Sequence, residues 1–459
     1  MGTRVELSPG VRRYGALLVG GAPARAVRLG AGGVALLADG GFALDGSTAR
    51  ATFAEQLVDA GLATYLPTGD PLPDRGGLVV VVPAFGRAEG VDRLLRALGG
   101  LHPVVLVDDH SPDPVALRDV AALHDAELLR LPANLGPAGA RNAGLLRARE
   151  RGAAFVLFAD SDVVVAPADV ERLRGAFADP RVAAAAPRVA ALVEDGSVLA
   201  RYEAAASSLD RGPVSAWVAP GGPVAYVPSA VVLARVDALG DGFDATLEVG
   251  EDVDLVWRLH RGGWRVRYDA GARAYHDHRT APVAWARRKS DYGESTAALA
   301  RRHGDLAAPA VLAPLGVAQL AAAVWQRPLG GAVAAGIAAV VGHRLAGRLG
   351  GGGEARRAAA ALVGRGTRMN CEQLTWSLLR HHWPLAVAGA LASRRVRRLV
   401  VVAVLVDTAT GWVRQRPDLD PVTYAVLRRA DDLAYGYGLW RGAIRARSGR
   451  ALLPAWRWA

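Results

Sequence analysis

The stretch LVVVVP, residues 78–83, is a continuous apolar run that ends at a proline. Such runs are typical of strands buried on both faces, as in parallel sheets that carry helices on either side. Three further runs follow along the chain: PVVLVDD (103–109), AELLRL (126–131) and AAFVLFADSD (153–162). Helical periodicity separates these runs, over residues 90–98, 115–124 and 138–151. The alternation predicts an α/β fold with a doubly wound, mostly parallel sheet and helices on both of its faces.

Beyond residue 183 the pattern is mixed, and it predicts further strands joined by loops rich in proline and glycine. Strands are expected at AAAAPRVAALV (183–193) and PSAVVLARV (228–236). The segment GWRVRYDAGARAYHDH (263–278) predicts two short strands joined by a turn. Ligands of doubly wound sheets bind at the carboxyl ends of strands, so the acidic motifs that follow these runs are the candidate site.

A chain of 459 residues is long enough for two or three domains. Its N-terminal part predicts a small winged-helix-like module, with a helix over residues 47–61 and a strand at LATYLP (62–67). The segment TGDPLPDRGG (68–77) predicts a linker. The expected domains are the module, a catalytic α/β domain and a helical C-terminal region, over residues 1–70, 77–300 and 301–459.

The positive charge of the chain lies in its C-terminal third. The whole chain carries a net charge of +11, whereas residues 301–459 contain 23 arginines against eight acidic residues. Lys289 is the only lysine, which indicates a GC-rich genome that favours arginine codons. Arginine abundance is therefore weak support for nucleic-acid binding, and no nucleic-acid partner is expected.

The C-terminal third is also apolar. Residues 306–326 carry no charge and are long enough to cross a bilayer, whereas the uncharged stretch 328–342 is short for a span. An arginine cluster precedes the run LVVVAVLV (399–406), which suits an anionic membrane surface: Arg394, Arg395, Arg397 and Arg398. The alternative is a buried helical domain with arginines on its solvent face. Peripheral association with the inner face of the cell membrane is expected rather than full insertion.

The cysteine content and the N-terminus both favour a cytoplasmic location. Cys371 is the only cysteine, so no intramolecular disulfide can form, as is usual in a reducing compartment. The first residues, MGTRVELSPGVRRYG, lack the apolar core of a secretory signal.

Two pairs of carboxylates follow buried strands. Asp160 and Asp162 form a D-x-D motif, and carboxylates at this spacing suit Mg²⁺ or Mn²⁺ bound together with substrate phosphates. Asp108 and Asp109 could accept hydrogen bonds from a nucleobase and a ribose. The alternatives are a solvated turn for the first pair and a helix N-cap for the second.

The segment NLGPAGARNAG (134–144) is the third candidate. A glycine-rich turn before a helix lets the backbone approach an anion closely, and an arginine can add a charge-assisted bond to a phosphate. A tight strand-to-helix turn is the alternative. The residues proposed to bind the donor here are Asn134, Gly136, Arg141 and Asn142.

Two later motifs complete the set. In GEDVD (250–254), acidic residues open a helix; Asp252 is the candidate general base, and a favourable interaction with the helix dipole is the alternative role. In YHDH (275–278), His276 or His278 could bind a metal, and a plain surface or core role is the alternative.

Taken together and in this order, the motifs resemble glycosyltransferase family 2, the inverting enzymes of the GT-A fold, over residues 77–280. The resemblance implies that Pro83 and Arg87 line the donor pocket. Asp109 would face the nucleobase, and Asp108 would lie beside it. The D-x-D carboxylates would lie at the sugar and the metal-bound diphosphate, with His276 as a late metal ligand. Asp252 would be the catalytic base, with Glu251 beside it at the acceptor.

A narrower resemblance runs nearly end to end. VRRYGALLVGGAPARAVRLG (11–30), QLVDAGLATYLP (56–67) and DDLAYGYGLWRGAIRAR (431–447) are similar to the mycofactocin-system glycosyltransferases of actinobacteria. This resemblance implies a UDP-glucose donor, a peptide-derived small acceptor (premycofactocin) and a product with a β-1,4-linked glucose chain. The N-terminal module is also similar to peptide-recognition domains of peptide-modifying pathways.

Two alternatives remain open at this point, and a third is disfavoured. The same chemistry could act on a cell-wall or lipid-linked glycan, as in rhamnosyl or galactofuranosyl transfer. The chain could be a non-catalytic peptide-binding protein, although it keeps the D-x-D pair and the Glu-Asp pair. A Rossmann-type dehydrogenase is disfavoured, because the first strand leads into VPAFGR rather than into a G-x-G-x-x-G turn.

Overall fold

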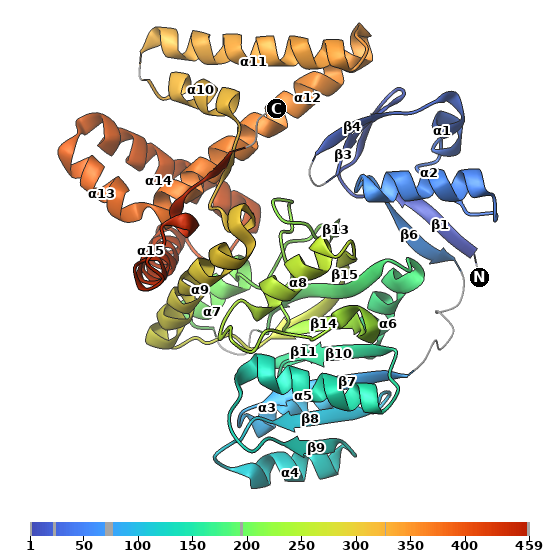
Figure 1. Cartoon of the computed structure of the whole chain (residues 1–459). Coiled ribbons are helices and arrows are strands. Elements are labelled where there is room, and N and C mark those ends of the chain that lie inside the picture. Colours follow the sequence, from blue (N-terminus) through green and yellow to red (C-terminus); the bar gives the residue numbers. More distant parts are fainter. Residues whose placement is uncertain (1, 22–23, 69–76, 193–195, 326, 457–459) are drawn as a thin grey trace. The chain divides into compact units, whose positions relative to one another are not determined.

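The computed structural model describes most of the chain (Figure 1), namely residues 2–21, 24–68, 77–192, 196–325 and 327–456. The chain forms two compact units. The first unit consists of residues 1–9 and 39–279, and the second of residues 10–38 and 280–459. Both units therefore draw on the N-terminal segment of the sequence.

A mixed sheet forms the centre of the first unit and, in the described residues, has nine strands. Its order is β11-β15-β12-β14-β10-β7-β8-β9, and β13 pairs with β15. The strands are β7 (Leu78–Ala84), β8 (Val104–Asp108), β9 (Glu127–Arg130), β10 (Phe155–Ala159), β11 (Val163–Val165), β12 (Val182–Ala191), β13 (Ala216–Trp217), β14 (Val231–Arg235) and β15 (Arg265–His276). Strands β10, β7, β8 and β9 run parallel, which confirms the expected α/β fold with a mostly parallel core.

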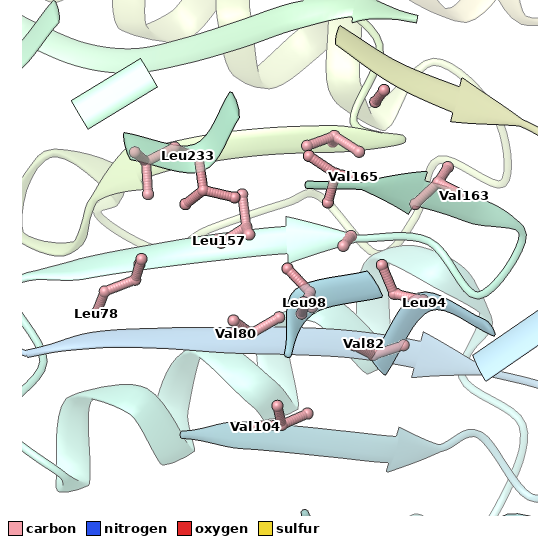
Figure 2. Packing of buried hydrophobic residues seen from close by; sticks show 14 of the residues in the cluster. Leu78, Val80, Val82, Leu94, Leu98, Val104, Leu157, Val163, Val165 and Leu233 are labelled. Atoms are coloured by element: carbon pink, nitrogen blue, oxygen red, sulfur yellow. The ribbon is translucent and has the colours of Figure 1, made fainter. Parts of the chain in front are cut away.

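Helices cover both faces of the sheet. They are α3 (Ala88–Leu98), α4 (Pro114–Leu123), α5 (Gly136–Glu150), α6 (Pro167–Arg174), α7 (Val198–Ala206) and α8 (Glu251–Arg261). Val80 and Val82 of β7 pack in one core cluster with Leu94 and Leu98 of α3 (Figure 2). Gly144 of α5 lies against the opposite face, where an added Cβ would meet a Val81 methyl at 2.2 Å. A glycine is required there because helix and strand pack so closely.

The core follows directly from the alternation of side chains along a strand. Alternate residues of β7 point to opposite faces, and both sets are apolar, so every residue of LVVVVPA is buried. Complete burial of a valine or leucine side chain stabilises the folded state by roughly 1.5–3 kcal/mol. The central strands therefore fix the positions of the loops that follow their carboxyl ends.

The expectation of two short strands over residues 263–278 is wrong. The structure has one strand, β15, which pairs in parallel with β12 over most of its length. The Asp-Ala-Gly sequence at 269–271 is a local turn signal. In the structure it lies within β15 at a shift in the pairing register, where Pro187 pairs with Asp269 and Arg188 pairs with Arg273. Pairing with a long neighbouring strand thus overrides the local turn signal.

A small antiparallel sheet of order β5-β1-β6 also belongs to the first unit, with helix α2 (Thr48–Asp59). Its strands are β1 (Gly2–Leu7), β5 (Gly41–Ala43) and β6 (Ala63–Thr68). Arg265 of β15 connects α2 to the central sheet, with ion pairs of 2.6 Å to Glu55 and Asp59 and of 2.7 Å to Asp179. The intervening strands β2 (Arg12–Tyr14), β3 (Leu17–Gly20) and β4 (Arg25–Arg28) and helix α1 (Ala31–Leu36) lie in the second unit. The three-domain division remains a prediction.

The second unit is mainly helical. Its helices are α9 (Pro282–His303), α10 (Pro314–Ala323), α11 (Pro328–Arg348), α12 (Gly352–Trp376), α13 (Trp383–Ala392), α14 (Arg394–Gln415) and α15 (Pro421–Arg445). A π-helical turn, η4 (Ser377–His381), follows α12, and two short strands, β16 (Val311–Leu312) and β17 (Ala455–Trp456), pair in parallel. Helices α9 and α15 pack closely at Gly438, where an added Cβ would meet the Ser290 carbonyl oxygen at 1.8 Å.

The expected bilayer-length segment at 306–326 does not form a single helix. Its described residues form a 3₁₀ turn, strand β16 and the ten-residue helix α10, because Pro309 and Pro314 interrupt the backbone hydrogen bonding. The long apolar helix is instead α11, whose residues Leu329–Arg348 have a mean hydropathy of 1.5 over the most apolar window and are mostly exposed. Length and composition would allow α11 to cross a membrane.

Buried charges connect the helices of the second unit. Lys289 on α9 lies 3.1 Å from Asp431 on α15, and Arg380 in η4 lies within 3.1 Å of both Asp431 and Asp432. Each of these charges has an opposite charge beside it, as buried ionic groups require. The single lysine of the chain is therefore part of the helical core.

Candidate active site

The candidate site lies where strands β7, β8 and β10 end. Ala84 and Asp108 are register partners on adjacent parallel strands, and Asp160 directly follows β10. The three strands run in the same direction, so the residues that follow them meet at one edge of the sheet. This is the edge at which the acidic motifs were predicted to lie.

Arg141 joins two of the acidic motifs. Its Nη2 donates to Asp160 Oδ1 at 2.6 Å, and its Nη1 donates to Glu251 Oε1 at 2.8 Å. The guanidinium is buried and lies 5.3 Å from the centre of the Phe243 ring. Burial opposes the charge on Arg141, but Asp160 and Glu251 outweigh it and raise the arginine's pKa. The D-x-D motif and the Glu-Asp pair therefore converge on one guanidinium group.

Asp252 lies beside this bridge at the start of α8. Its Oδ2 accepts a hydrogen bond from the Ser229 amide at 3.3 Å, and its Oδ1 accepts one from the Val253 amide at 2.7 Å. Burial and the neighbouring Glu251 carboxylate raise the pKa of Asp252 to about 7. A partly exposed carboxylate with this pKa can take up a proton near neutral pH. Gly250, with φ of 90°, caps the helix in the left-handed conformation.

The two residues of the Asp-Asp pair have different surroundings. The Asp108 carboxylate is fully buried and accepts hydrogen bonds from the Ser111 amide at 2.8 Å and from Arg130. Asp109 Oδ1 accepts from the Leu135 amide at 2.7 Å, which ties the end of β8 to the start of α5. Burial raises the pKa of Asp109. The partners of Asp108 suit a structural role, and its expected place at the donor remains a prediction, as does that of Asp109.

Asp162 faces a basic residue on one side and a histidine on the other. Arg87 Nη1 lies 3.0 Å from Asp162 Oδ2, and His276 Nε2 lies 3.3 Å from Asp162 Oδ1. Arg87 adopts a left-handed φ of 56° at the start of α3, a strained conformation for a non-glycine residue. Burial raises the pKa of both Asp160 and Asp162. Six predicted site residues are therefore linked by direct contacts into two groups that share the D-x-D turn: Arg141 with Asp160 and Glu251, and Asp162 with Arg87 and His276.

The rival histidine, His278, lies next to His276 with ring centroids 4.7 Å apart. Its Nδ1 faces Glu203 Oε2 of α7 at 4.0 Å, whereas His276 faces the D-x-D motif. The geometry therefore favours His276 over His278 as the histidine beside Asp162.

The glycine-rich segment forms the first turns of α5. Gly136 has a φ of 72°, and its amide donates to Asn134 Oδ1 at 3.1 Å. Asn142 instead holds a distant loop: its amide group exchanges hydrogen bonds of 2.7 and 2.8 Å with the backbone of Phe243. Pro83 is buried within β7 opposite Val107. The geometry thus assigns Asn142 and Pro83 structural contacts, and their donor-binding roles remain predictions.

Three residues that support the site were not predicted from the sequence: Phe243, Ser229 and Arg130. Phe243 packs edge-on against Phe158 with ring centroids 5.1 Å apart, and the Arg141 guanidinium lies over its ring. Arg130 at the end of β9 neutralises Asp108. Arg130 could have been predicted, because it ends a strand that neighbours the strand of the Asp-Asp pair. Phe243 could not, because it lies 102 residues from Arg141 along the chain and meets it only in the folded protein.

The D-x-D turn offers carboxylate oxygens to a divalent cation. In the part of the chain that the structure describes, no group of three or more His, Cys, Asp or Glu side chains is arranged to hold an ion without other ligands. Mg²⁺ and Mn²⁺ commonly use one or two carboxylates together with substrate phosphates. The desolvated Asp162 carboxylate, with His276 at 3.3 Å, fits an ion completed by a diphosphate.

Comparison with known proteins agrees with the fold and the motif order. The profile of "Glycosyl transferase family 2" matches residues 79–212, and that of "Glycosyl transferase family group 2" matches residues 155–342. The chain is 42% identical over 452 residues to the "Pre-mycofactocin glycosyltransferase" of two Mycobacterium tuberculosis strains, which covers 96% of this chain and 94% of the relative. The matched sheet and acidic motifs define a glycosyltransferase with a GT-A-like fold. The chain belongs to glycosyl transferase family 2.

Solved structures match more distantly. Staphylococcus aureus TarS (residues 1–349) has 19% identity and a TM-score of 0.37, covering 49% of this chain and 64% of that chain. GalNAc-T7 with UDP, GalNAc and Mn²⁺ has 14% identity and a TM-score of 0.36, covering 50% of this chain and 52% of that chain. These likenesses extend over about half of the present chain.

Proposed function

We propose that this glycosyltransferase transfers glucose from UDP-glucose to premycofactocin, with inversion at the anomeric carbon, and builds a β-1,4-linked glucose chain. The acceptor is supported by the printed name of the relative, which is 42% identical across nearly the whole of both chains. The donor sugar and the linkage are supported by the resemblance in sequence motifs. The same site would serve each successive transfer.

The observation that carries the proposal is the Arg141 bridge between Asp160 and Glu251. A single side chain thus connects the D-x-D turn, which suits a sugar diphosphate, to a helix that begins with two carboxylates. A transferase requires this juxtaposition, because the donor and the acceptor must meet at one reacting carbon.

The reaction is a single displacement. An acceptor hydroxyl oxygen forms a bond to the anomeric carbon of the donor, while the bond from that carbon to the phosphate oxygen breaks. The hydroxyl proton passes to Asp252, and the electron pair of the broken bond leaves with UDP. Attack opposite the leaving group inverts the configuration. A base that is poised near neutral pH contributes about 10²–10⁴ to such a rate.

The D-x-D turn and His276 would hold the divalent cation beside the diphosphate. When bound, such an ion neutralises negative charge on the leaving group. Arg87 contributes a second positive group next to Asp162, and its side chain is partly exposed toward solvent. These residues orient the donor, while Glu251 and Asp252 lie on the acceptor side.

The test is an assay with the purified full chain. Premycofactocin is incubated with UDP-glucose, UDP-galactose, UDP-N-acetylglucosamine or GDP-mannose, in the presence of Mn²⁺, Mg²⁺ or a chelator, and products are followed by mass spectrometry. We expect addition of hexoses from UDP-glucose, loss of activity with chelator, and a β linkage in the product by NMR. Transfer to a lipid-linked or cell-wall glycan but not to premycofactocin would contradict the acceptor assignment. An α linkage would contradict inversion.

A further inference from the structure

The corner between α13 and α14 carries four exposed arginines. They lie at the first residues of α14 and follow a ten-residue helix, α13, that contains no charged residue. The four residues are Arg394, Arg395, Arg397 and Arg398. In the described residues, no carboxylate pairs with Arg394, Arg397 or Arg398, although Arg397 donates to the Ala390 carbonyl oxygen at 3.5 Å.

Helix stability does not account for this cluster. The start of a helix carries partial positive charge, so cations there are unfavourable and acidic residues are preferred. No acidic residue stands in the first turn of α14, and no side chain caps it. In the described residues, the charges of Arg394, Arg397 and Arg398 therefore have no carboxylate that would offset this cost, and they are available to an anionic partner.

Exposed aliphatic side chains lie next to the arginines. On α13, Leu385 and Leu391 are 58% and 79% exposed, and on α14, Val402 and Leu405 are 56% and 63% exposed. Large apolar residues gathered in one place on a surface mark an interaction site. Val401, Val406 and Val413 extend this apolar face along α14.

The opposite face of α14 is already occupied. Asp407 forms an ion pair of 2.6 Å with Arg428 of α15, and it also contacts Arg429. An added Cβ at Gly411 would meet the Tyr424 hydroxyl at 2.5 Å, so the two helices are in close contact. The packing therefore holds the aliphatic face and the arginines outward as one fixed surface.

We propose that the α13–α14 corner binds an anionic lipid surface. The arginines contact lipid phosphates, and the exposed leucine and valine side chains enter the boundary between headgroups and acyl chains. Basic residues beside an aliphatic helical face are the combination that binds an anionic bilayer interface. Single-stranded nucleic-acid sites use aromatic side chains for stacking, whereas the outward residues named here are aliphatic.

The composition of the second unit supports the same partner. Residues 301–459 hold 23 arginines against eight acidic residues, and α11 adds a 20-residue apolar stretch that the unit leaves largely unburied. The proposal concerns where the enzyme works, and it does not depend on the identity of the acceptor or donor.

The experiment is vesicle co-sedimentation of the full chain. Vesicles of phosphatidylcholine are compared with vesicles in which about a third of the lipid is phosphatidylglycerol. The test variant is R394Q/R395Q/R397Q/R398Q. The matched control is R96Q/R118Q/R149Q/R261Q, which removes the same charge from exposed positions of the first unit. Circular dichroism establishes that each variant is folded.

The wild type and the control are expected to sediment with anionic vesicles and not with phosphatidylcholine alone. The test variant should bind at least about tenfold more weakly, since each basic residue at such a surface contributes. A second variant, L391N/V402N/L405N, should also bind vesicles more weakly than the wild type. This difference from the wild type should persist at high salt, because salt does not screen the contribution of apolar side chains.

Three results would overturn the proposal. The first is wild-type protein that stays in the supernatant with anionic vesicles. The second is an equal loss of vesicle binding in the control variant, which would show that net charge alone, and not the α13–α14 corner, determines binding. The third is evidence that the corner serves another partner. The R394Q/R395Q/R397Q/R398Q variant would then lose binding to duplex DNA, or lose a dimer seen by ultracentrifugation, while its binding to vesicles stayed unchanged.

Discussion

Arg141 is a buried guanidinium group that pairs with carboxylates from two different elements, Asp160 after β10 and Glu251 at the start of α8. Its planar fork places one N–H group toward each partner, a geometry that a lysine ammonium cannot reproduce. The residue therefore holds the D-x-D turn and the start of α8 together, and these are the proposed donor and acceptor sides of the site. Loss of the bridge would separate them even if both carboxylates remained.

We predict that Arg141→Lys lowers kcat/KM by about 100-fold, because a misplaced reacting group costs that much. The unfolding free energy should fall by about 1–3 kcal/mol, since one buried carboxylate loses its partner. Steady-state kinetics and urea denaturation measure the two effects. Arg147→Lys, on the exposed side of the same helix, is the control and should change neither. Full activity in Arg141→Lys would remove Arg141 from the site.

The raised pKa of Asp252 predicts the pH dependence of the reaction. Burial and Glu251 raise this pKa to about 7, and the base must be ionised to accept a proton. Below pH 7 the carboxyl is increasingly protonated, so kcat/KM should fall about tenfold per pH unit. A pH–rate profile over the stable range measures this. A rate that stays constant from pH 8 down to pH 5.5 would show that Asp252 is not the base.

At the scale of elements, Asn142 of α5 holds the loop that leads into α8. Its side-chain amide exchanges two hydrogen bonds with the backbone of Phe243, whose ring lies beside Arg141. This contact connects a helix to a loop about a hundred residues later and so sets the start of α8. The position of Asp252 depends on it.

We predict that Asn142→Ala costs about 2 kcal/mol of unfolding free energy, because it leaves a buried N–H and C=O of Phe243 unsatisfied. It should also lower kcat more than it weakens donor binding. Denaturation and initial-rate kinetics provide the measurements. Asp113→Ala removes an exposed contact at the start of α4 and serves as the control. If the two variants behaved alike, the loop would not depend on Asn142.

Much of the central fold could be predicted from sequence because its signals are local. LVVVVP and FVLFA are apolar throughout, so burial on both faces follows directly, and carboxylates after such strands must gather at one sheet edge. β15 could not be predicted in the same way. Its Asp-Ala-Gly sequence is a turn signal, and only pairing with β12 makes it one strand.

The contacts within the site were less predictable than its location. Asp108 and Asp109 are adjacent in sequence, yet one is neutralised by Arg130 and the other ties β8 to α5. Hydropathy likewise could not show that the long apolar helix is α11 rather than residues 306–326. Both segments are apolar, but two prolines divide residues 306–326 into short elements. Such distinctions depend on partners that are distant along the chain.

At the scale of the whole molecule, each unit has its own buried ionic network. Arg265 connects α2 to the central sheet in the first unit, and Lys289 pairs with Asp431 in the second. We predict two calorimetric transitions, one from each unit. Arg265→Met should lower the unfolding free energy of the first unit, and Lys289→Met that of the second, each by about 1–3 kcal/mol, because the buried Asp179 and Asp431 carboxylates each lose a charged hydrogen-bond donor. A single transition that both variants lower equally would contradict separate folding of the units.

We propose that the acidic clusters divide the work of one site: the D-x-D turn would hold the donor, and Asp252 would remove the acceptor proton. Single-turnover transfer from UDP-glucose by Asp252→Asn tests it most directly, in protein shown by calorimetry to bind the donor normally. Glu248→Gln, an exposed carboxylate on the same loop, is the matched control. We expect normal donor affinity, a loss of at least about 100-fold in transfer by Asp252→Asn, and none in the control. Transfer at the wild-type rate by Asp252→Asn would contradict the account.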